Sequence, residues 1–348
     1  MSDIARFIKR VETLIGDGQV LEAHHALCKY LAKPKLPFTA FRAWTEIVAG
    51  SQCVSLQSIK DARKHAKLTS DEKAILDSYS FVDAWLRFDA PALEALLLEY
   101  HDFTLRNDGV KDVVNARIHF RLCIRTLTHR MQNLAKYTGG AGANLVFIGD
   151  SHALVPSGRI FTWRGRSVIA SGMAIRGIKM FHLGKKSPPK WKAFFREKLK
   201  HLPPECEVVV SIGEIDCRPN EGIFYTAKRR NISKNDLLET TVQQFVDFAS
   251  QEISKSEKNI SGVTLMGVPF PAYDIERWWP GTGGRQEFQE FILSVNAAMR
   301  HHSARVGWDF LDVYSATLPD EKHSDNNIRL DEFHLAPVFY DAAENWIR

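Results

Sequence analysis

The segment Phe147-Ile-Gly-Asp-Ser-His-Ala153 decides the fold of the larger part of this chain. It completes a short apolar run that begins at Asn144 and predicts a buried strand ending at the Gly-Asp-Ser sequence. Open α/β folds bind their ligands at the carboxyl ends of the strands, so we expect the Ser151 hydroxyl at that edge. A helix that follows such a strand can turn its first free N–H groups toward an oxyanion. The alternative is an ordinary helix cap made by Asp150 or Ser151.

Strand-like and helix-like segments alternate after this first strand. Short runs rich in β-branched and apolar residues predict further strands at 167–170, 207–212, 263–268 and 308–312. Longer amphipathic segments between them predict helices at 189–200, 235–256 and 285–305. Buried strands that alternate with helices indicate the α/β class, with a parallel sheet covered on both faces.

The first 138 residues have a different pattern and predict an all-α domain. Val20, Ala23, Leu27 and Leu31 recur at helical spacing, and the preceding segment ends at Asp17-Gly18. This first pair of helices weakly resembles a tetratricopeptide hairpin, but no clean 34-residue repeat follows. The small-residue stretch 137–143 is a natural linker. We therefore expect domains at 1–138 and 144–348.

A second motif stands near the C-terminal end, in Leu330-Asp-Glu-Phe-His-Leu-Ala336. Asp331 and His334 are three residues apart, so one turn can bring the carboxylate to the imidazole. In such a pair the carboxylate holds the ring tautomer, and the other ring nitrogen accepts a proton from a serine. The alternative is a surface aspartate and a structural histidine. The two motifs together are much more specific than either one alone.

The paired motifs resemble the SGNH/GDSL hydrolase superfamily, and the Gly-Asp-Ser-His-Ala form is similar to SGNH domains that handle acyl groups on bacterial glycans. The resemblance covers residues 144–348 and implies a flavodoxin-like, three-layer SGNH domain. It also implies Ser151 as nucleophile, His334 as general base and Asp331 as the residue that orients the base.

Two further blocks of the superfamily supply oxyanion donors. A glycine after the second strand is one of them, and Gly172 is the candidate, with a plain turn glycine as the alternative. The third block is Gly-x-Asn-Asp, whereas this chain has Gly213-Glu-Ile-Asp216, so Ile215 occupies the asparagine position. An isoleucine side chain cannot donate a hydrogen bond, and the loss of one oxyanion donor typically slows catalysis roughly 100- to 1,000-fold.

The charged cluster around Ile215 offers a replacement donor. Arg218 is the best candidate, because a guanidinium can stabilise an oxyanion or hold a substrate carboxylate, with Glu214 and Asp216 beside it. The alternative is an internal arginine–aspartate pair that braces the loop. His152 follows the expected nucleophile and either contacts substrate or is an exposed or capping residue. Asp150 and Gly213 complete the expected substrate site.

Other side chains suggest a carbohydrate or glycoconjugate substrate. Tyr273, Trp278 and Trp279 stand beside a glycine-rich stretch and form either a stacking wall for a sugar ring or a small local core. Basic residues crowd two segments, where they form either a solvated surface or a positive rim for an anionic substrate. These two segments contain Lys185, Lys186, Lys190, Lys192, Arg196, Lys198 and Lys200, and Lys228, Arg229, Arg230 and Lys234.

Composition narrows the class of protein. The net charge of +5 is too mild to indicate a nucleic-acid partner, and no stretch is apolar enough for a membrane span. The five cysteines are irregularly spaced, which argues against a disulfide framework and favours a reducing compartment. The N-terminal segment lacks the apolar core of a signal peptide. We expect a cytoplasmic protein without a metal ion or an organic cofactor.

The sequence thus predicts serine-dependent ester hydrolysis or acyl transfer on a carbohydrate or glycoconjugate, with an acetyl-type ester. One alternative is a non-hydrolytic transferase or binding protein of a glycan pathway on the same fold. The other is a scaffold pseudoenzyme that recruits a protein partner through its helical domain.

Overall fold

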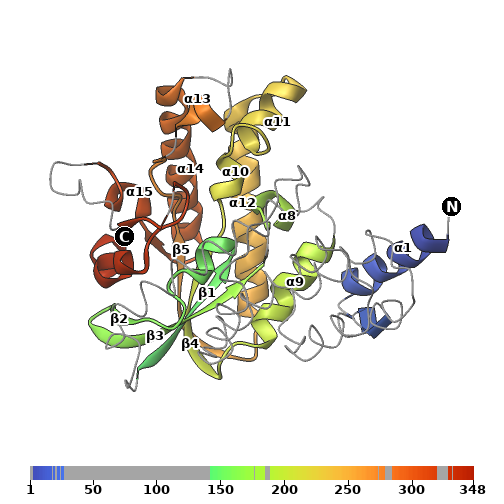
Figure 1. Ribbon diagram of the computed structural model, residues 1–348. Helices are drawn as coiled ribbons and strands as arrows, with labels where there is room; N and C mark the ends of the chain where they lie inside the picture. The colour runs from blue at the N-terminus through green and yellow to red at the C-terminus, as the bar shows by residue number, and fades with distance from the viewer. Residues whose placement is uncertain are drawn as a thin grey trace, which may run out of the picture. The chain divides into compact units, whose positions relative to one another are not determined.

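Figure 1 shows the protein as a computed structural model. The chain divides into two units, one of residues 1–133 and 188–201 and the other of residues 134–187 and 202–348. The structure describes residues 3–17, 19, 22–23, 25–26, 142–175, 177–184, 189–272, 274–278, 284–319, 328–330 and 332–348.

The first unit contributes two described helices. Helix α1 (Asp3–Gly16) buries Val11 and Ile15, which lie one turn apart on the same face. Helix α9 (Pro189–Lys200) starts on a proline, which suits the first helical position because its missing N–H would have no partner there. Both agree with the helices that the sequence predicts. Most of the expected all-α domain lies outside the described residues, as do most of the second helix of the tetratricopeptide-like hairpin and residues 137–141 of the linker.

The second unit is built on a six-stranded sheet with the order β2-β3-β1-β4-β5-β6. Five of these strands are parallel, and β2 alone runs antiparallel to its neighbour β3. The parallel strands follow the order 2-1-3-4-5 of a flavodoxin-like sheet, as predicted. The strands are β1 (Ala143–Gly149), β2 (Ile160–Trp163), β3 (Arg166–Ala174), β4 (Glu205–Ser211), β5 (Asn259–Met266) and β6 (Asp309–Leu311).

The antiparallel strand β2 was not predicted. It is joined to β3 by the two residues Arg164 and Gly165, which both have positive φ, at 54° and 72°. This is the backbone of a two-residue hairpin, in which both central residues take the left-handed conformation. Arginine rarely adopts it, so Arg-Gly gives a weaker turn signal than Asn-Gly. The sheet is therefore mixed rather than wholly parallel.

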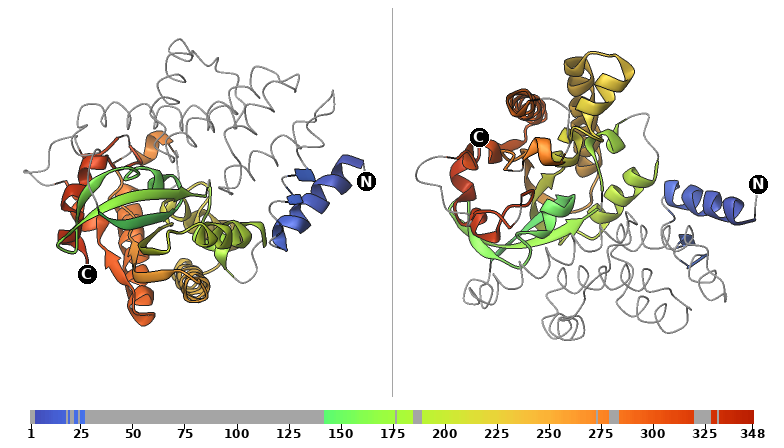
Figure 2. Two further views of the ribbon diagram at one scale, coloured as in Figure 1. Left: turned by 90° about the horizontal axis from the view of Figure 1, so that it is seen from below. Right: turned by 45° about the horizontal axis from the view of Figure 1, so that its top comes forward.

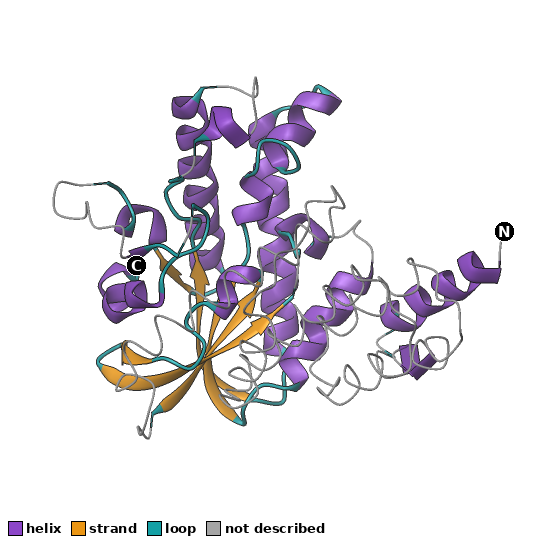
Figure 3. Ribbon diagram, viewed as in Figure 1, coloured by secondary structure: helices purple, strands orange, loops and turns teal. Residues whose placement is uncertain are grey.

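Helices cover both faces of this sheet. On one face Leu145 and Phe147 of β1 pack in a core with Phe339 and Tyr340 of the 3₁₀ helix η4 (Pro337–Trp346). The alternate residues of β1 point to the opposite face, where Figures 2 and 3 show α12 (Lys234–Ser254) and α14 (Arg285–Arg305). The predicted α/β layering is therefore confirmed for this unit.

Shorter helices lie in the connections between strands. They are η2 (Ser151–Leu154), α8 (Met180–Leu183), α10 (Glu214–Cys217), α11 (Ile223–Arg230), α13 (Ile275–Trp278) and α15 (Val313–Ala316). In the part of the chain that the structure describes, every helix is too short or too polar to cross a membrane.

Candidate active site

Ser151 lies where strand β1 ends, in the middle of the sheet. β1 is flanked by β3 on one side and by β4 on the other, so the chain leaves this strand at the topological switch point, where open α/β sheets bind ligands. Ser151 opens the single-turn helix η2. The Asp150 carboxylate accepts a hydrogen bond of 2.9 Å from the N–H of His152 and so caps this turn. Asp150 therefore has the capping role that was the alternative interpretation of this motif.

His334 meets Ser151 from the other end of the sequence. Its Nε2 atom lies 2.8 Å from Ser151 Oγ, in a part-buried hydrogen bond. The segment around it folds back on itself, because Leu330 N–H donates to His334 O at 2.9 Å and Ala336 N–H donates to Ile328 O at 2.7 Å. Residue 331 itself lies outside the described residues. The structure thus brings Ser151 and His334 together, and the role expected of Asp331 stays a prediction.

Arg329 anchors this segment to the rest of the domain. Its guanidinium donates a hydrogen bond of 2.6 Å to the carbonyl oxygen of Phe270, which follows β5. The backbone of Arg329 also pairs with Leu335 as an isolated antiparallel bridge. His334, which is 4% exposed, is therefore held by a short closed turn rather than by a free loop.

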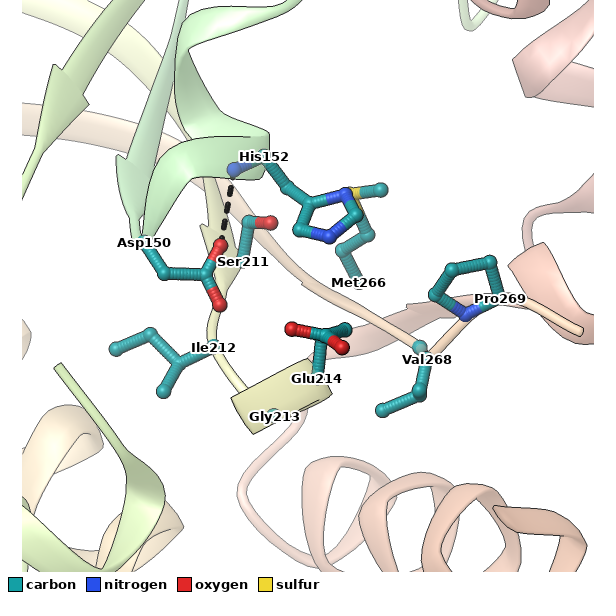
Figure 4. A pocket seen from close by; sticks show the side chains of 10 residues that line it. Asp150, His152, Ser211, Ile212, Gly213, Glu214, Met266, Val268 and Pro269 are labelled. Atoms are coloured by element: carbon teal, nitrogen blue, oxygen red, sulfur yellow. Dashed lines mark hydrogen bonds between the residues drawn. The ribbon is translucent and has the colours of Figure 1, made fainter. Parts of the chain in front are cut away.

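A shallow cleft lies beside His152, where β1, β4 and β5 end (Figure 4). The carboxylates of Asp150 and Glu214 and the ring of His152 face it, while Val268 and Pro269 give it an apolar wall. The walls of this cleft therefore combine apolar and ionisable surface.

The surroundings of Asp150 shift the pKa of its carboxyl group. Burial raises the pKa of this carboxyl group to about 7, and the negative charge of Glu214 adds to the effect. The hydrogen bond from His152 N–H and the charges of His334 and Arg218 oppose it. Asp150 is therefore a carboxyl group that changes its protonation state near neutral pH.

His152 is buried, at 3% exposure, and is not an exposed helix-start residue. Its ring centroid lies 5.0 Å from that of His334, with the two planes tilted by 35°. Two imidazoles therefore sit side by side at the expected reaction centre. His152 contacts the His334 ring and also lines the cleft, so it is in a position to contact a group bound there.

The structure gives Gly172 a different place from the one predicted. Strand β3 continues to Ala174, so Gly172 lies inside the strand and not after it. Its N–H already donates to Ser157 Oγ at 3.0 Å, and a Cβ atom there would lie 2.4 Å from the carbonyl oxygen of Ala153. Gly172 is thus required for close packing of β3 against η2, and its N–H is not directed at Ser151.

The glycine that does follow β3 is Gly177, which the sequence reasoning missed. It has φ of 69°, a conformation that favours glycine, in a turn whose Ile175 N–H donates to the carbonyl oxygen of Gly149 at 2.6 Å. This turn therefore lies against the end of β1, next to the Gly-Asp-Ser segment. The signal was present, but the strand was predicted to end at residue 170.

Arg218 and Asp216 do not pair with each other. Asp216 accepts hydrogen bonds from the N–H groups of Met180 and Phe181, at 2.7 and 3.2 Å, and so caps helix α8. Arg218 pairs with Glu214, at 2.7 Å, and with Glu221, at 3.2 Å. The expectation that Arg218 replaces the missing asparagine donor gains no support from this geometry, because two carboxylates hold its guanidinium.

The remaining predicted residues are spread over the unit. Gly213 caps α10 and lines the cleft, and Ile215 is half-buried in α10. Lys228, Arg229 and Arg230 are exposed on the last turn of α11. Tyr273 and Trp279 lie outside the described residues, as do Lys185 and Lys186 and the side chain of Trp278.

Comparison with known proteins gives similar folds but no similar sequences. No protein-family model and no curated protein matches the chain. A catalytic mutant of an acetylxylan esterase from Geobacillus stearothermophilus is 13% identical, with 60% of this chain and 93% of that chain covered and a TM-score of 0.37. A lipase/acylhydrolase from Enterococcus faecalis is 18% identical (59% and 92% covered, TM-score 0.35), and phospholipase A1 from Streptomyces albidoflavus NA297 is 15% identical (59% and 99% covered, TM-score 0.36).

The C-terminal unit has a doubly wound α/β fold with a flavodoxin-like order of its parallel strands. A serine after β1 meets a histidine after β6 at the carboxyl edge of its sheet. This is the arrangement that the Gly-Asp-Ser and Asp-x-x-His sequences predict.

Proposed function

We propose that the chain is a serine-dependent esterase or acyltransferase. The observation that carries this proposal is the 2.8 Å contact between Ser151 Oγ and His334 Nε2 at the carboxyl edge of the sheet. In this mechanism Ser151 attacks the ester carbonyl while His334 accepts the hydroxyl proton, and an acyl-enzyme forms. Water or an acceptor hydroxyl then releases the acyl group. Asp331 orients His334, in accordance with the sequence motif.

We assign the oxyanion donors to the backbone. The N–H groups of Asp150, His152 and Ala153 already donate within the domain. That of Ser151 at the start of η2 is the first proposed donor, and that of Gly177, in the turn beside β1, is the second. A site with two backbone donors and Ile215 in place of a third is expected to be slower than one with three, by roughly 100- to 1,000-fold.

A carbohydrate or glycoconjugate acetyl ester is the proposed substrate. The Gly-Asp-Ser-His form of the motif and the basic last turn of α11 support this class. Exposed cations on α11 favour a substrate that carries negative charge.

A fluorophosphonate probe, which reacts with activated serines, tests the proposal. The parent should be labelled and should hydrolyse an acetyl ester, and Ser151→Ala should do neither while keeping its melting temperature. Ser294→Ala, which removes an exposed hydroxyl from α14, is the matched control and should behave like the parent. An unlabelled but folded parent would contradict the proposal.

That outcome would favour the second candidate, a non-hydrolytic glycan-binding or transferase domain. The specific observation in its favour is Ile215, which puts a side chain without a donor at the third oxyanion position. Calorimetric binding of an acetylated oligosaccharide without release of acetate would support it. Release of acetate that depends on Ser151 would exclude it.

A further inference from the structure

Arg218 connects the segment after β4 to the segment that carries His334. Three of its N–H groups donate to carboxylates, which fix the orientation of the guanidinium plane. Nε donates to both carboxylate oxygens of Glu214 at 3.1 Å, and Nη2 donates to Glu214 Oε2 at 2.7 Å. Nη1 donates to Glu221 Oε1 at 3.2 Å. An arginine that is bound from two sides has little rotamer freedom left.

The carboxylates are themselves anchored. Glu221 also accepts a hydrogen bond of 3.1 Å from Lys179 Nζ, in the segment before α8. Glu214 is buried at the start of α10, one of the residues that line the cleft. The guanidinium of Arg218 is therefore tied directly to the connection between β4 and β5 and, through Glu221 and Lys179, to the connection between β3 and β4, and it forms a rigid, flat surface.

Phe333 packs on that surface. The Cζ atom of Arg218 lies 5.5 Å from the centroid of the Phe333 ring, which is the distance of a cation–π contact. Phe333 directly precedes His334, inside the short turn that the Arg329–Leu335 bridge closes. A displacement of the Phe333 ring would therefore displace the backbone of His334.

We propose that Arg218 is a positioning residue that acts through Phe333 to keep His334 on Ser151. The proposal rests on the proposed function, because it concerns the geometry of that serine–histidine pair. A hydrogen bond of 2.8 Å between the two side chains tolerates little movement, and a shift of about 1 Å can slow a reaction roughly 100-fold. In this role Arg218 is neither an oxyanion donor nor a nucleophile. It fixes the residue that accepts the proton.

The competing explanation is that Arg218 only neutralises Glu214. In that case the aromatic ring of Phe333 contributes nothing, and only changes at Arg218 itself affect the reaction. Phe333→Leu separates the two explanations because it removes the ring and leaves every ion pair of Arg218 in place. Phe333→Tyr keeps the ring and serves as the conservative variant.

The experiment measures the rate of fluorophosphonate labelling and, with an acetyl ester, kcat and KM separately. Tyr225→Leu is the matched control, since Arg229 lies over the Tyr225 ring at the same 5.5 Å on the surface of α11. We expect Phe333→Leu to lower the labelling rate and kcat about 10-fold, with KM within about twofold. Phe333→Tyr should restore both rates to within about twofold, and Tyr225→Leu should leave them unchanged.

A double-mutant cycle with Arg218→Gln completes the test. If Arg218 acts through Phe333, the double variant is about as slow as the slower single variant. The inference would be overturned if the rate losses of the two single variants multiplied in the double variant. A rate for Phe333→Leu equal to that of the parent would also overturn it. The two Phe333 variants still decide the question if Arg218→Gln does not fold. A parent that is not labelled at Ser151 would overturn the proposed function and this inference with it, whereas a labelled parent with a parent-like Phe333→Leu would overturn only the inference.

Discussion

Buried carboxyl groups lie near both ends of strand β4, and their charged and polar surroundings differ. Near its start, Glu207 accepts a hydrogen bond of 3.0 Å from Trp163 Nε1 and forms ion pairs with Arg164, at 3.1 Å, and with Arg166. Beyond its end, Glu214 shares a cleft with Asp150. Arginines pair with both Glu207 and Glu214, but Asp150 is fully buried beside Glu214, and burial dominates the behaviour of its carboxyl group.

This difference separates a structural carboxylate from a reactive one. Glu207 joins the β2–β3 hairpin to the middle of the sheet through these partners. Asp150 is fully buried against another carboxylate, and burial raises its pKa to about 7. Perturbed carboxyl groups of this kind cluster at functional sites. The raised pKa of Asp150 therefore indicates a functional site at the carboxyl edge of the sheet rather than at its amino edge.

The largest effect is expected from a substitution at the carboxyl edge of the sheet. His334→Ala should lower the rate of acetyl-ester hydrolysis by roughly 1,000-fold or more, since Ser151 then has no base. Its unfolding temperature should change little. The matched control is His301→Ala, which removes an exposed imidazole from α14. Equal turnover by the two variants would exclude His334 as the base.

A smaller effect is expected in the pH dependence of stability. The folded pKa of Asp150, about 7, lies above its unfolded value of 3.8, so the folded state binds the proton more tightly. The resulting stabilisation is complete below about pH 4 and is lost as the pH rises toward 7. Asp150→Asn keeps an oxygen for the His152 N–H but cannot titrate. Relative to this variant, the parent should lose a few kcal/mol of unfolding free energy between pH 4 and pH 7, roughly 1.4 kcal/mol per pKa unit.

Urea unfolding of both proteins at pH 4, 5.5 and 7 checks this prediction. Groups that titrate in both proteins, such as Asp216, cancel in the difference, so the comparison isolates Asp150. Parallel curves for parent and variant would show that Asp150 titrates at its ordinary pKa.

The smallest effect is expected at the amino edge. Glu207→Ala should lower the free energy of unfolding by about 1–3 kcal/mol, because it leaves the buried Trp163 N–H without its acceptor. The two arginines are part-exposed and can return to water. Glu205→Ala, at an exposed position of the same strand, is the control. Ester turnover per folded molecule should stay at the parent level, and a loss of turnover in the folded variant would contradict the division between the two edges.

The parallel strands of the C-terminal unit and the long helices that connect them in sequence could be predicted from hydrophobic pattern alone. The predicted helices at 189–200, 235–256 and 285–305 correspond closely to α9, α12 and α14. These segments bury continuous or periodic apolar surface, which is the signal that sequence carries most clearly. The meeting of Ser151 and His334 followed from topology, since strand ends of a parallel sheet gather at one edge.

What could not be predicted depended on backbone details and on local pairing. The apolar run of β3 breaks at Ser171-Gly172, but parallel pairing with β1 carries the strand on to Ala174. Because of that difference of four residues, the sequence pointed to Gly172, which lies inside the strand, and not to Gly177, which follows it. The sequence likewise left the partner of Arg218 open between Glu214 and Asp216. Glu214 lies four residues before Arg218, and this spacing brings the two together only if residues 214–217 form a helical turn, as they do.

The serine–histidine contact spans 183 residues of sequence. During synthesis the chain emerges from its N-terminal end, so β1 and the serine are made long before the turn that holds the histidine. The contact can close only after β4, β5 and β6 have taken their places in the sheet, because they lie between the two segments in the chain. A nascent or truncated chain therefore carries Ser151 without the histidine that contacts it. Under the proposed function, reactivity arises last, as a property of the finished domain.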